Sequence, residues 1–393
     1  MHFISGLINN SMTLPGIVFF LLCLLMIFLY VILLLRGITG WLLFPKTIVQ
    51  KNNQSQTFVS VIVAVRNESE HILNCLNHLE VQNYSFMEVI ISDDFSEDTT
   101  RSLVQDFINN RTDKNISWKL IQAAVNDKTG KKGALERGIS NAKGELIITT
   151  DADCTMGNFW VKSFADCYQN SQASMVTGMV QIRNAKSIAE QFQALEFISL
   201  TGSGAASVIL NKPIMCNGAN LAFTRKIFIE TGGYEYGHNL ATGDDVFLML
   251  QIAQSGQKKI IFNKSKESIV STTPVAGWNE FISQRKRWAS KVSHYSEHYI
   301  KMTGVGIILV NMLLILLLPA AAFNLLSWNH AAVIWIIKIA ADFIFLFPFL
   351  NYTRQLHLLF LFLPASILYP FYIISGLISS PGAAGYSWKG RSY

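Results

Sequence analysis

The chain has 393 residues, of which 50% are hydrophobic and only 15% charged. A soluble domain carries about 25% charged residues, so part of this chain is expected to face lipid. The net charge of +6 is modest, and the Lys and Arg residues are scattered or lie near apolar segments. This distribution of basic residues suits a membrane surface or a phosphate ligand better than nucleic acid. The five cysteines are odd in number and form no C-x-x-C pair, which argues against a zinc site and a disulfide framework.

The first strongly apolar segment covers residues 14–35. Its length fits one bilayer crossing, which takes about 20 apolar residues. No small-residue cleavage site follows, so we expect a membrane anchor and not a signal peptide. Arg36, Lys46 and Lys51 come next and place the following segment in the cytoplasm by the positive-inside rule. The sequence therefore predicts an N-terminal anchor over residues 1–50.

Residues 51–300 have the composition of a soluble domain. Apolar, β-branched runs predict four buried strands, over residues 59–65, 87–92, 118–121 and 145–150. Helical spacing lies between them, over residues 69–79, 99–109 and 134–142. We expect Ser96 to cap the second of these helices. This alternation predicts a doubly wound, mostly parallel α/β sheet.

Two later helical segments in this domain are candidates for interfacial amphipathic helices. Residues 187–210 are too polar to span a bilayer, and an interfacial helix and a core helix explain them equally well. Residues 281–288 carry aromatic residues on one side and dense positive charge on the other. An interfacial basic helix is the simplest interpretation of that segment.

The chain becomes apolar again after Gly304, with runs over residues 305–326, 331–350 and 356–378. Lys338 and Asp342 lie four residues apart in the second run, so they can pair on one helical face. A neutral pair facing a neighbouring helix is favoured over a transport role. The sequence thus predicts a C-terminal membrane region over residues 301–393.

The short basic tail of that region raises a question of topology. Four spans place the C-terminus outside, whereas Lys389 and Arg391 favour the cytoplasmic side. The sequence leaves both placements open.

Three pairs of acidic residues follow one another along the soluble part: Asp93 and Asp94, Asp151 and Asp153, and Asp244 and Asp245. Each lies where a predicted strand ends or where a loop meets a helix, which is where α/β sheets bind ligands. Adjacent carboxylates repel each other and are costly without a partner. The first pair can accept the imide N–H of uracil or a ribose hydroxyl. Favourable acidic charge at a helix N-terminus is the alternative explanation.

Asp151 and Asp153 are two residues apart in an extended segment, so both side chains can face one site. Their hard oxygen atoms suit Mg²⁺ or Mn²⁺, with substrate phosphates and water completing the coordination. Asp244 and Asp245 follow Gly243 at a helix start. A carboxylate there can act as a general base if an acceptor hydroxyl comes within hydrogen-bond reach.

The segment from Thr129 to Ala134 resembles part of a phosphate-binding loop, but Val125 stands where that motif requires glycine. Lys131 still lies at a helix start, where a lysine can meet a diphosphate, and a solvated lysine is the alternative. Gly218 lies among small residues and lets the backbone approach a bulky ligand, although an ordinary turn explains it equally well.

Gln284, Arg287 and Trp288 lie at positions i, i+3 and i+4 and share one face of the predicted basic helix. Arg287 can neutralise a leaving diphosphate, and Trp288 can stack on a sugar ring.

In their order, these motifs resemble the membrane-bound family 2 glycosyltransferases with the GT-A fold. The motifs are Val65-Arg-Asn-Glu68, Asp93-Asp94-Phe-Ser-Glu-Asp98, Gly130-Lys131, Asp151-Ala-Asp153, Gly243-Asp-Asp245 and Gln284-x-x-Arg287-Trp288. The resemblance covers residues 58–291 and the membrane segments. It implies a multi-pass protein of a bacterial inner membrane, with a cytoplasmic domain that transfers sugar from a nucleotide-sugar, preferably a UDP-sugar.

The resemblance also implies a role for each matching residue near the donor. Val65, Glu68, Asp93 and Asp94 would contact the nucleotide. Lys131 would contact its phosphates or ribose, Asp151 would lie beside the nucleotide-sugar, and Asp153 would coordinate Mg²⁺ or Mn²⁺. Val65 departs from the family pattern, because many relatives have a polar residue there.

On the acceptor side, Asp245 matches the catalytic base of the family. Asp244 replaces the commoner glutamate of that motif and keeps its charge. Gln284, Arg287 and Trp288 match a motif beside the acceptor and the diphosphate. The implied reaction is inverting.

The acceptor is open on the sequence. The Gln284-x-x-Arg287-Trp288 motif favours a processive synthase of a β-linked polymer such as cellulose, hyaluronan or poly-N-acetylglucosamine. The short chain and few spans favour a single transfer to a lipid or lipid-linked acceptor, which we prefer. Two other classes of protein are disfavoured. A nucleotidyltransferase would need a Gly-rich loop near the N-terminus, which this sequence lacks. A non-catalytic scaffold would not need Asp153, Asp245 and Arg287, and all three are present.

Overall fold

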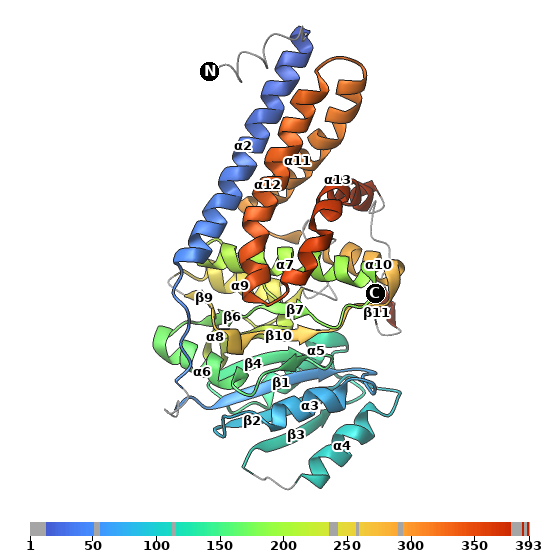
Figure 1. Cartoon of the computed structure of the whole chain (residues 1–393). Coiled ribbons are helices and arrows are strands. Elements are labelled where there is room, and N and C mark those ends of the chain that lie inside the picture. Colours follow the sequence, from blue (N-terminus) through green and yellow to red (C-terminus); the bar gives the residue numbers. More distant parts are fainter. Residues whose placement is uncertain are drawn as a thin grey trace. The chain divides into compact units, whose positions relative to one another are not determined.

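A computed structural model describes residues 13–50, 56–111, 115–235, 243–256, 259–289, 294–378, 387–388 and 391–392. The chain divides into two compact units. A helical unit is formed by residues 1–42 and 284–384, and an α/β unit by residues 43–283 and 385–393 (Figure 1). Lys51, Lys291 and Lys389 lie outside the described residues.

The α/β unit is built on a seven-stranded sheet with the order β3-β2-β1-β4-β8-β6-β9. Its parallel half consists of the four predicted strands: β1 (Val59–Val65), β2 (Met87–Asp93), β3 (Ser117–Gln122) and β4 (Leu146–Asp151). Strands β1 and β2 are almost wholly buried, as expected of β-branched runs inside a parallel sheet. The prediction of a mostly parallel α/β sheet is confirmed.

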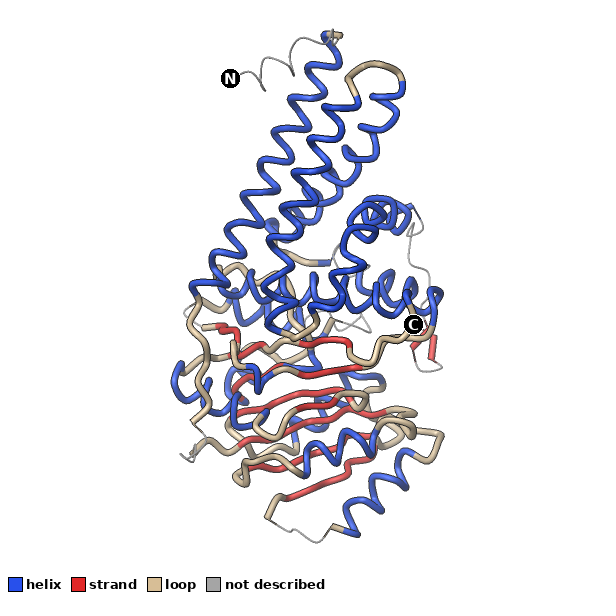
Figure 2. Tube along the Cα trace, in the orientation of Figure 1, coloured by secondary structure: helices blue, strands red, loops and turns tan. Residues whose placement is uncertain are grey.

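The other strands are short. Strand β8 (Leu221–Thr224) pairs antiparallel with β4 and with β6 (Met175–Thr177), and β9 (Ile260–Phe262) pairs parallel with β6. A separate three-stranded sheet has the order β5-β10-β7, formed by Thr155–Met156, Val270–Thr272 and Val180–Ile182. Figure 2 shows these strands in red among the helices.

In the described part of this unit, the helices that connect or cover the strands are α3 (Ile72–Glu80), α4 (Thr100–Asn110), α5 (Gly130–Ser140), α6 (Trp160–Ser171), α7 (Ile188–Ile209), α8 (Arg225–Glu230) and α9 (Asp244–Gln254). Helix α5 packs against β1 and β2, and α4 against β3. Helix α7 packs against β7 and β9 and buries most of its central residues, which fits the core interpretation of this segment.

The expectation that Ser96 caps α4 is wrong. The N-cap of that helix is Thr99, and the carboxylate of Asp98 accepts the N–H of Thr100 at 2.9 Å. The hydroxyl of Ser96 instead accepts the N–H of Asn67 at 3.1 Å. Ser96 therefore ties the loop after β2 to the loop after β1.

Among the residues that the structure describes, four helices are long and apolar enough to cross a membrane: Leu14–Leu43 (α2), His298–Ala322 (α11), Trp328–Tyr352 (α12) and Leu356–Gly376, which combines η4 (Leu356–Leu361) with most of α13 (Phe362–Ile378). The predicted apolar runs fall within or largely overlap these helices. Helix α10 (Gly277–Ala289) contains the boundary between the two units.

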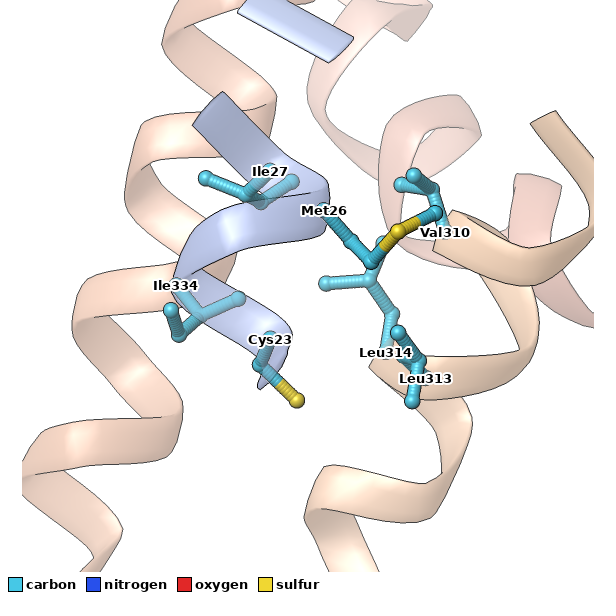
Figure 3. Close-up of a pocket in the computed structure, with 7 residues that line it drawn as sticks. All are labelled: Cys23, Met26, Ile27, Val310, Leu313, Leu314 and Ile334. Carbon is cyan, nitrogen blue, oxygen red and sulfur yellow. The ribbon is translucent and has the colours of Figure 1, made fainter. Parts of the chain in front are cut away.

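An apolar part of the contact joins α2 to α11 and α12. Figure 3 shows this contact, lined by Cys23, Met26 and Ile27 of α2, Val310, Leu313 and Leu314 of α11, and Ile334 of α12. The space left between these side chains is only about 10 Å³. Dispersion contacts between close-packed side chains therefore hold the three helices together.

One polar cluster lies within the helical unit. The predicted pair of Lys338 and Asp342 is confirmed, with 2.7 Å between Nζ and Oδ2. The hydroxyl of Tyr30 on α2 donates to Oδ1 of Asp342 at 2.7 Å, and Lys338 donates to the carbonyl of Ser366 on α13 at 3.4 Å. The cluster joins α2, α12 and α13.

Candidate active site

The carboxyl ends of the central strands bring three predicted site residues to one edge of the sheet. Val65 pairs with Asp93 across β1 and β2, and Ala64 pairs with Asp151 across β1 and β4. Because this register is parallel, the residues that follow Val65, Asp93 and Asp151 leave the sheet at the same level. This is the edge at which α/β sheets bind ligands.

Lys131 lies among three of the predicted carboxylates. Its Nζ is 2.5 Å from Oδ1 of Asp151. Burial alone would lower the pKa of Lys131, but Asp151, Asp244 and Asp245 together raise it well above the usual value for lysine. The residues at the start of α5, the end of β4 and the start of α9 thus form one charged cluster.

Gly218 and Asp245 are in direct contact. The N–H of Gly218 donates to Oδ2 of Asp245 at 2.9 Å, and the N–H of Val246 donates to Oδ1 at 2.8 Å. The hydroxyl of Thr149 on β4 donates to the carbonyl of Gly218 at 2.6 Å. The turn before β8 is therefore fixed to β4 and holds the carboxylate of Asp245 in one orientation.

Tyr234 is a further member of this site that the sequence did not single out. Its side chain is buried, and burial together with Asp244 and Asp245 raises its pKa well above the usual value. It follows the two glycines Gly232 and Gly233, both with positive φ. That pair of glycines was the available signal, because a sharp turn there delivers Tyr234 toward the start of α9.

Asp153 has its own partners beside this cluster. The hydroxyl of Thr272 donates to Oδ2 of Asp153 at 2.8 Å, and the thiol of Cys154 lies 3.6 Å from Oδ1. Burial raises the pKa of the Cys154 and Cys75 thiols, and the nearby Asp153 and Asp151 raise both further. Both cysteines are small buried side chains next to Asp151 and Asp153, and both remain protonated thiols.

These residues permit a test of whether the site suits Mg²⁺ or Mn²⁺. Among the described residues, no group of three or more His, Cys, Asp or Glu side chains could hold a metal ion. Asp151 forms an ion pair with Lys131, so Asp153 is the carboxylate of the acidic pair that can ligate a metal ion. Mg²⁺ typically binds through one or two carboxylates plus substrate phosphates. The donor set fits a metal that arrives with a diphosphate.

The two acidic residues after β2 have different partners. Oδ2 of Asp93 accepts from the guanidinium of Arg101 at 3.0 Å and from the N–H of Ser96 at 3.2 Å. Oδ2 of Asp94 accepts the N–H of Gly130 at 2.9 Å, which fixes the start of α5. Both carboxyl groups are buried. Asp94 therefore positions the loop that presents Lys131.

Arg66 fastens the loop that carries Glu68. It donates to the carbonyls of Asp94 at 2.7 Å and Phe95 at 2.6 Å, and it pairs with Glu97 at 3.0 Å. The N–H of Glu68 donates to the hydroxyl of Thr100 at 2.8 Å. Sequence reasoning missed the role of Arg66, although it lies inside the Val65-to-Glu68 motif.

Gln284, Arg287 and Trp288 lie in the second half of α10, which belongs to the helical unit. Arg285 donates to Oε1 of Gln284 at 2.5 Å, and its guanidinium carbon lies 4.3 Å from the ring centroid of Trp288. Arg285 thus contacts two of the three predicted residues, Gln284 through a hydrogen bond and Trp288 through a cation–π contact.

A mostly parallel sheet with carboxylates at its strand ends is the architecture of GT-A glycosyltransferases. A solved structure of this class, a mannosyltransferase from Pyrobaculum calidifontis in complex with GDP-Man and Mn²⁺, aligns with a TM-score of 0.56 over 93% of this chain and 97% of its own. At 18% identity, that likeness shows the fold alone. Residues 60–232 match the family model of glycosyl transferase family 2.

Two curated relatives match parts of this chain. A poly-beta-1,6-N-acetyl-D-glucosamine synthase from Staphylococcus epidermidis is 32% identical over 158 residues, which is 39% of this chain and 36% of that protein. The glycosyltransferase AglE from Haloferax volcanii is 27% identical over 204 residues, which is 51% of this chain and 62% of that protein. The chain thus spans only about a third of the first relative and less than two thirds of the second.

Proposed function

We propose that this protein transfers a sugar from a nucleotide-sugar to a membrane lipid or lipid-linked acceptor, with inversion at the anomeric carbon. One observation carries the proposal: Lys131 lies among Asp151, Asp244 and Asp245 at the sheet edge, in contact distance of the first. A cation for phosphates and a carboxylate for an attacking hydroxyl are the two groups that such a transfer requires.

The proposed reaction is a single displacement. The acceptor hydroxyl attacks the anomeric carbon and forms the new C–O bond, while the bond from that carbon to the diphosphate oxygen breaks. Asp245 takes the hydroxyl proton, and its orientation is fixed by the N–H groups of Gly218 and Val246. The nucleoside diphosphate leaves, and an α-linked donor gives a β-linked product.

Other residues would bind and orient the donor. Lys131 would meet the phosphates, and Asp93 and Glu68 would contact the nucleotide, preferentially uridine. Asp153 would hold Mg²⁺ or Mn²⁺ together with the diphosphate. When bound, that ion neutralises negative charge on the leaving group. The resemblance of Gln284-x-x-Arg287-Trp288 to the family motif supports roles beside the diphosphate and the acceptor.

We further propose the membrane arrangement expected from the sequence. Residues 1–50 would form the N-terminal anchor, residues 51–300 a cytoplasmic catalytic domain and residues 301–393 the C-terminal membrane region. The four apolar helices support a multi-pass protein. A membrane-embedded chain is well placed to use an acceptor that is itself anchored in lipid.

Polymer synthesis is a second candidate function. It is supported by the 32% identity to a protein named as a poly-beta-1,6-N-acetyl-D-glucosamine synthase. Under this alternative the acceptor is the growing glycan, and the same carboxylate would act at each step.

Product analysis separates these alternatives. Full-length protein in detergent is supplied with membrane lipids, Mn²⁺ and a panel of radiolabelled donors, namely UDP-sugars and GDP-mannose. One labelled species extractable into organic solvent supports transfer to lipid, whereas a ladder of oligomers supports the polymer alternative. Release of sugar 1-phosphate in place of a nucleoside diphosphate would contradict both, because it would place the cleavage between the two phosphates of the donor, as in nucleotidyl transfer.

A further inference from the structure

Thr272 is the last residue of β10, and its hydroxyl donates to Oδ2 of Asp153 at 2.8 Å. The two residues are far apart in sequence, and no motif contains both. Asp153 itself lies between β4 and β5, in a stretch that is not part of either strand. A hydrogen bond from another strand is therefore a direct constraint on where this carboxylate points.

The small sheet fixes Thr272 in place. Strand β10 pairs antiparallel with β5, with Ser271 opposite Thr155, so the next residue of β10 lies beside the turn that carries Asp153. On its other side β10 pairs parallel with β7, and the N–H of Arg183 donates to the carbonyl of Thr272 at 3.0 Å. The backbone of Thr272 is thus hydrogen-bonded within a three-stranded sheet.

The segment after Thr272 is also anchored. Gln193 on α7 donates to the carbonyl of Val275 at 3.1 Å and accepts its N–H at 3.2 Å. With the chain held on both sides, the backbone that presents the hydroxyl of Thr272 is fixed beside Asp153. This segment continues along the chain into α10.

The other group near the carboxylate is a weaker donor. The thiol of Cys154 lies 3.6 Å from Oδ1 of Asp153, and thiols donate only weak hydrogen bonds. The hydroxyl of Thr272 is both closer and stronger. Of these two, Thr272 is the side chain that sets the orientation of Asp153.

We propose that Thr272 is a positioning residue for Asp153 and thereby sets the affinity of the site for a divalent cation. The inference rests on the proposed function, in which Asp153 holds the metal. Outer partners that orient a metal ligand typically affect metal affinity by about 10- to 100-fold. A threonine hydroxyl can fulfil this role without itself touching the donor sugar or the acceptor.

The test measures Mn²⁺ binding, not turnover. Full-length protein in detergent, saturated with UDP, is titrated with Mn²⁺, and free Mn²⁺ is followed by electron paramagnetic resonance. The variants are Thr272→Val, which removes the hydroxyl at nearly constant shape, and Thr272→Ser, which keeps it. Thr155→Val is the matched control, because its hydroxyl belongs to the same small sheet but donates to the carbonyl of Ser271 at 3.3 Å. Asp153→Asn is the reference for loss of the ligand.

We expect Thr272→Val to raise the Kd for Mn²⁺ by about 10- to 100-fold. Thr272→Ser and Thr155→Val should stay close to wild type, and all variants should keep the wild-type melting temperature. An unchanged Kd in Thr272→Val overturns the inference, and so does an equal shift in Thr155→Val, which would indicate a general effect of the sheet. If Asp153→Asn itself binds Mn²⁺ normally, the metal assignment in the proposed function fails, and the role of Thr272 fails with it.

Discussion

The Nζ of Lys131 lies 2.5 Å from Oδ1 of Asp151, and this pair connects the start of α5 with the end of β4. Burial acts to lower the pKa of Lys131, but Asp151, Asp244 and Asp245 raise it well above 10.5, its ordinary value. Because the pKa of Lys131 is higher in the folded than in the unfolded protein, its charge stabilises the fold. This stabilisation is fully present below the pKa of the unfolded state and is lost only as the pH rises through the pKa of the folded state. Lys131 is therefore a permanent cation at physiological pH.

The first prediction is that Lys131→Met lowers kcat/KM by at least about tenfold, since a hydrogen bond between charged groups is worth about 1.5–3 kcal/mol. Steady-state kinetics over a range of donor concentrations measures this loss. Lys128→Met is the matched control, because Lys128 pairs with Glu136 at 3.0 Å on the surface, where ion pairs contribute about 0–1 kcal/mol. Unchanged donor affinity and turnover in Lys131→Met would remove the lysine from the proposed site.

The second prediction concerns the base. Asp245→Asn keeps an oxygen that can accept the N–H of Gly218 but cannot take a proton. We expect kcat to fall by about 10²- to 10⁴-fold, the usual contribution of general base catalysis, while UDP binding by calorimetry is retained. The exposed Asp106→Asn on α4 serves as control. Full turnover in Asp245→Asn would contradict the assignment of the base.

The parallel half of the sheet was predictable because its strands have a strong local signal. The run from Val59 to Val65 is β-branched and wholly apolar apart from Ser60, and it could hardly be anything other than a buried strand. The strands β5, β7 and β10 have only two or three residues each. Such segments show no periodicity, so the three-stranded sheet could not be predicted from the sequence.

The same distinction applies to the site. The acidic residues were found because each follows a recognisable strand or begins a helix. Thr272 and Arg101 were missed because their partners, Asp153 and Asp93, are set by tertiary contact and not by spacing along the chain. The structure also gave Asp94 a partner that the sequence could not indicate, the N–H of Gly130.

The third prediction tests why position 218 is a glycine. A Cβ added there would lie 3.5 Å from Cβ of Asp245 and 3.7 Å from Oδ2 of Asp244, which is ordinary van der Waals contact. Gly218→Ala should therefore fold and retain turnover. Gly218→Val adds methyl groups about 1.5 Å further out, so we expect it to displace Asp245 and lower kcat. Equal activity in the two variants would show that space at this position does not matter.

The fourth prediction concerns acid stability. Burial acts to raise the pKa of Asp98, but hydrogen bonds from Thr100 and Ser69 lower it from 3.8 to about 2. A lowered folded pKa stabilises the protein above the unfolded value, and that contribution is lost as the pH falls from 3.8 to about 2. Asp98→Asn should thus lower the melting temperature at neutral pH and approach wild type near pH 2. A difference that is independent of pH would point to lost packing.

The last prediction concerns the polar cluster of the helical unit. Lys338 is 1% exposed and pairs with Asp342 at 2.7 Å. Removing one partner of a buried pair leaves an uncompensated charge and costs about 3–5 kcal/mol. Lys338→Leu and Asp342→Leu should each lower the melting temperature in detergent, whereas the double variant should recover most of the loss. This outcome is expected if the pair only neutralises itself between helices.

Tyr30→Phe provides the third arm of that experiment. It removes the hydrogen bond from α2 to Asp342 but leaves the ion pair intact. Interhelical hydrogen bonds of this kind are worth about 0.6 kcal/mol on average in membrane proteins, so the shift should be small beside that of either charged partner. In the double variant Lys338→Leu/Asp342→Leu, Tyr30→Phe should have no further effect, because the acceptor carboxylate is gone.

If the double variant Lys338→Leu/Asp342→Leu is as unstable as either single variant, the two charges do more than neutralise each other.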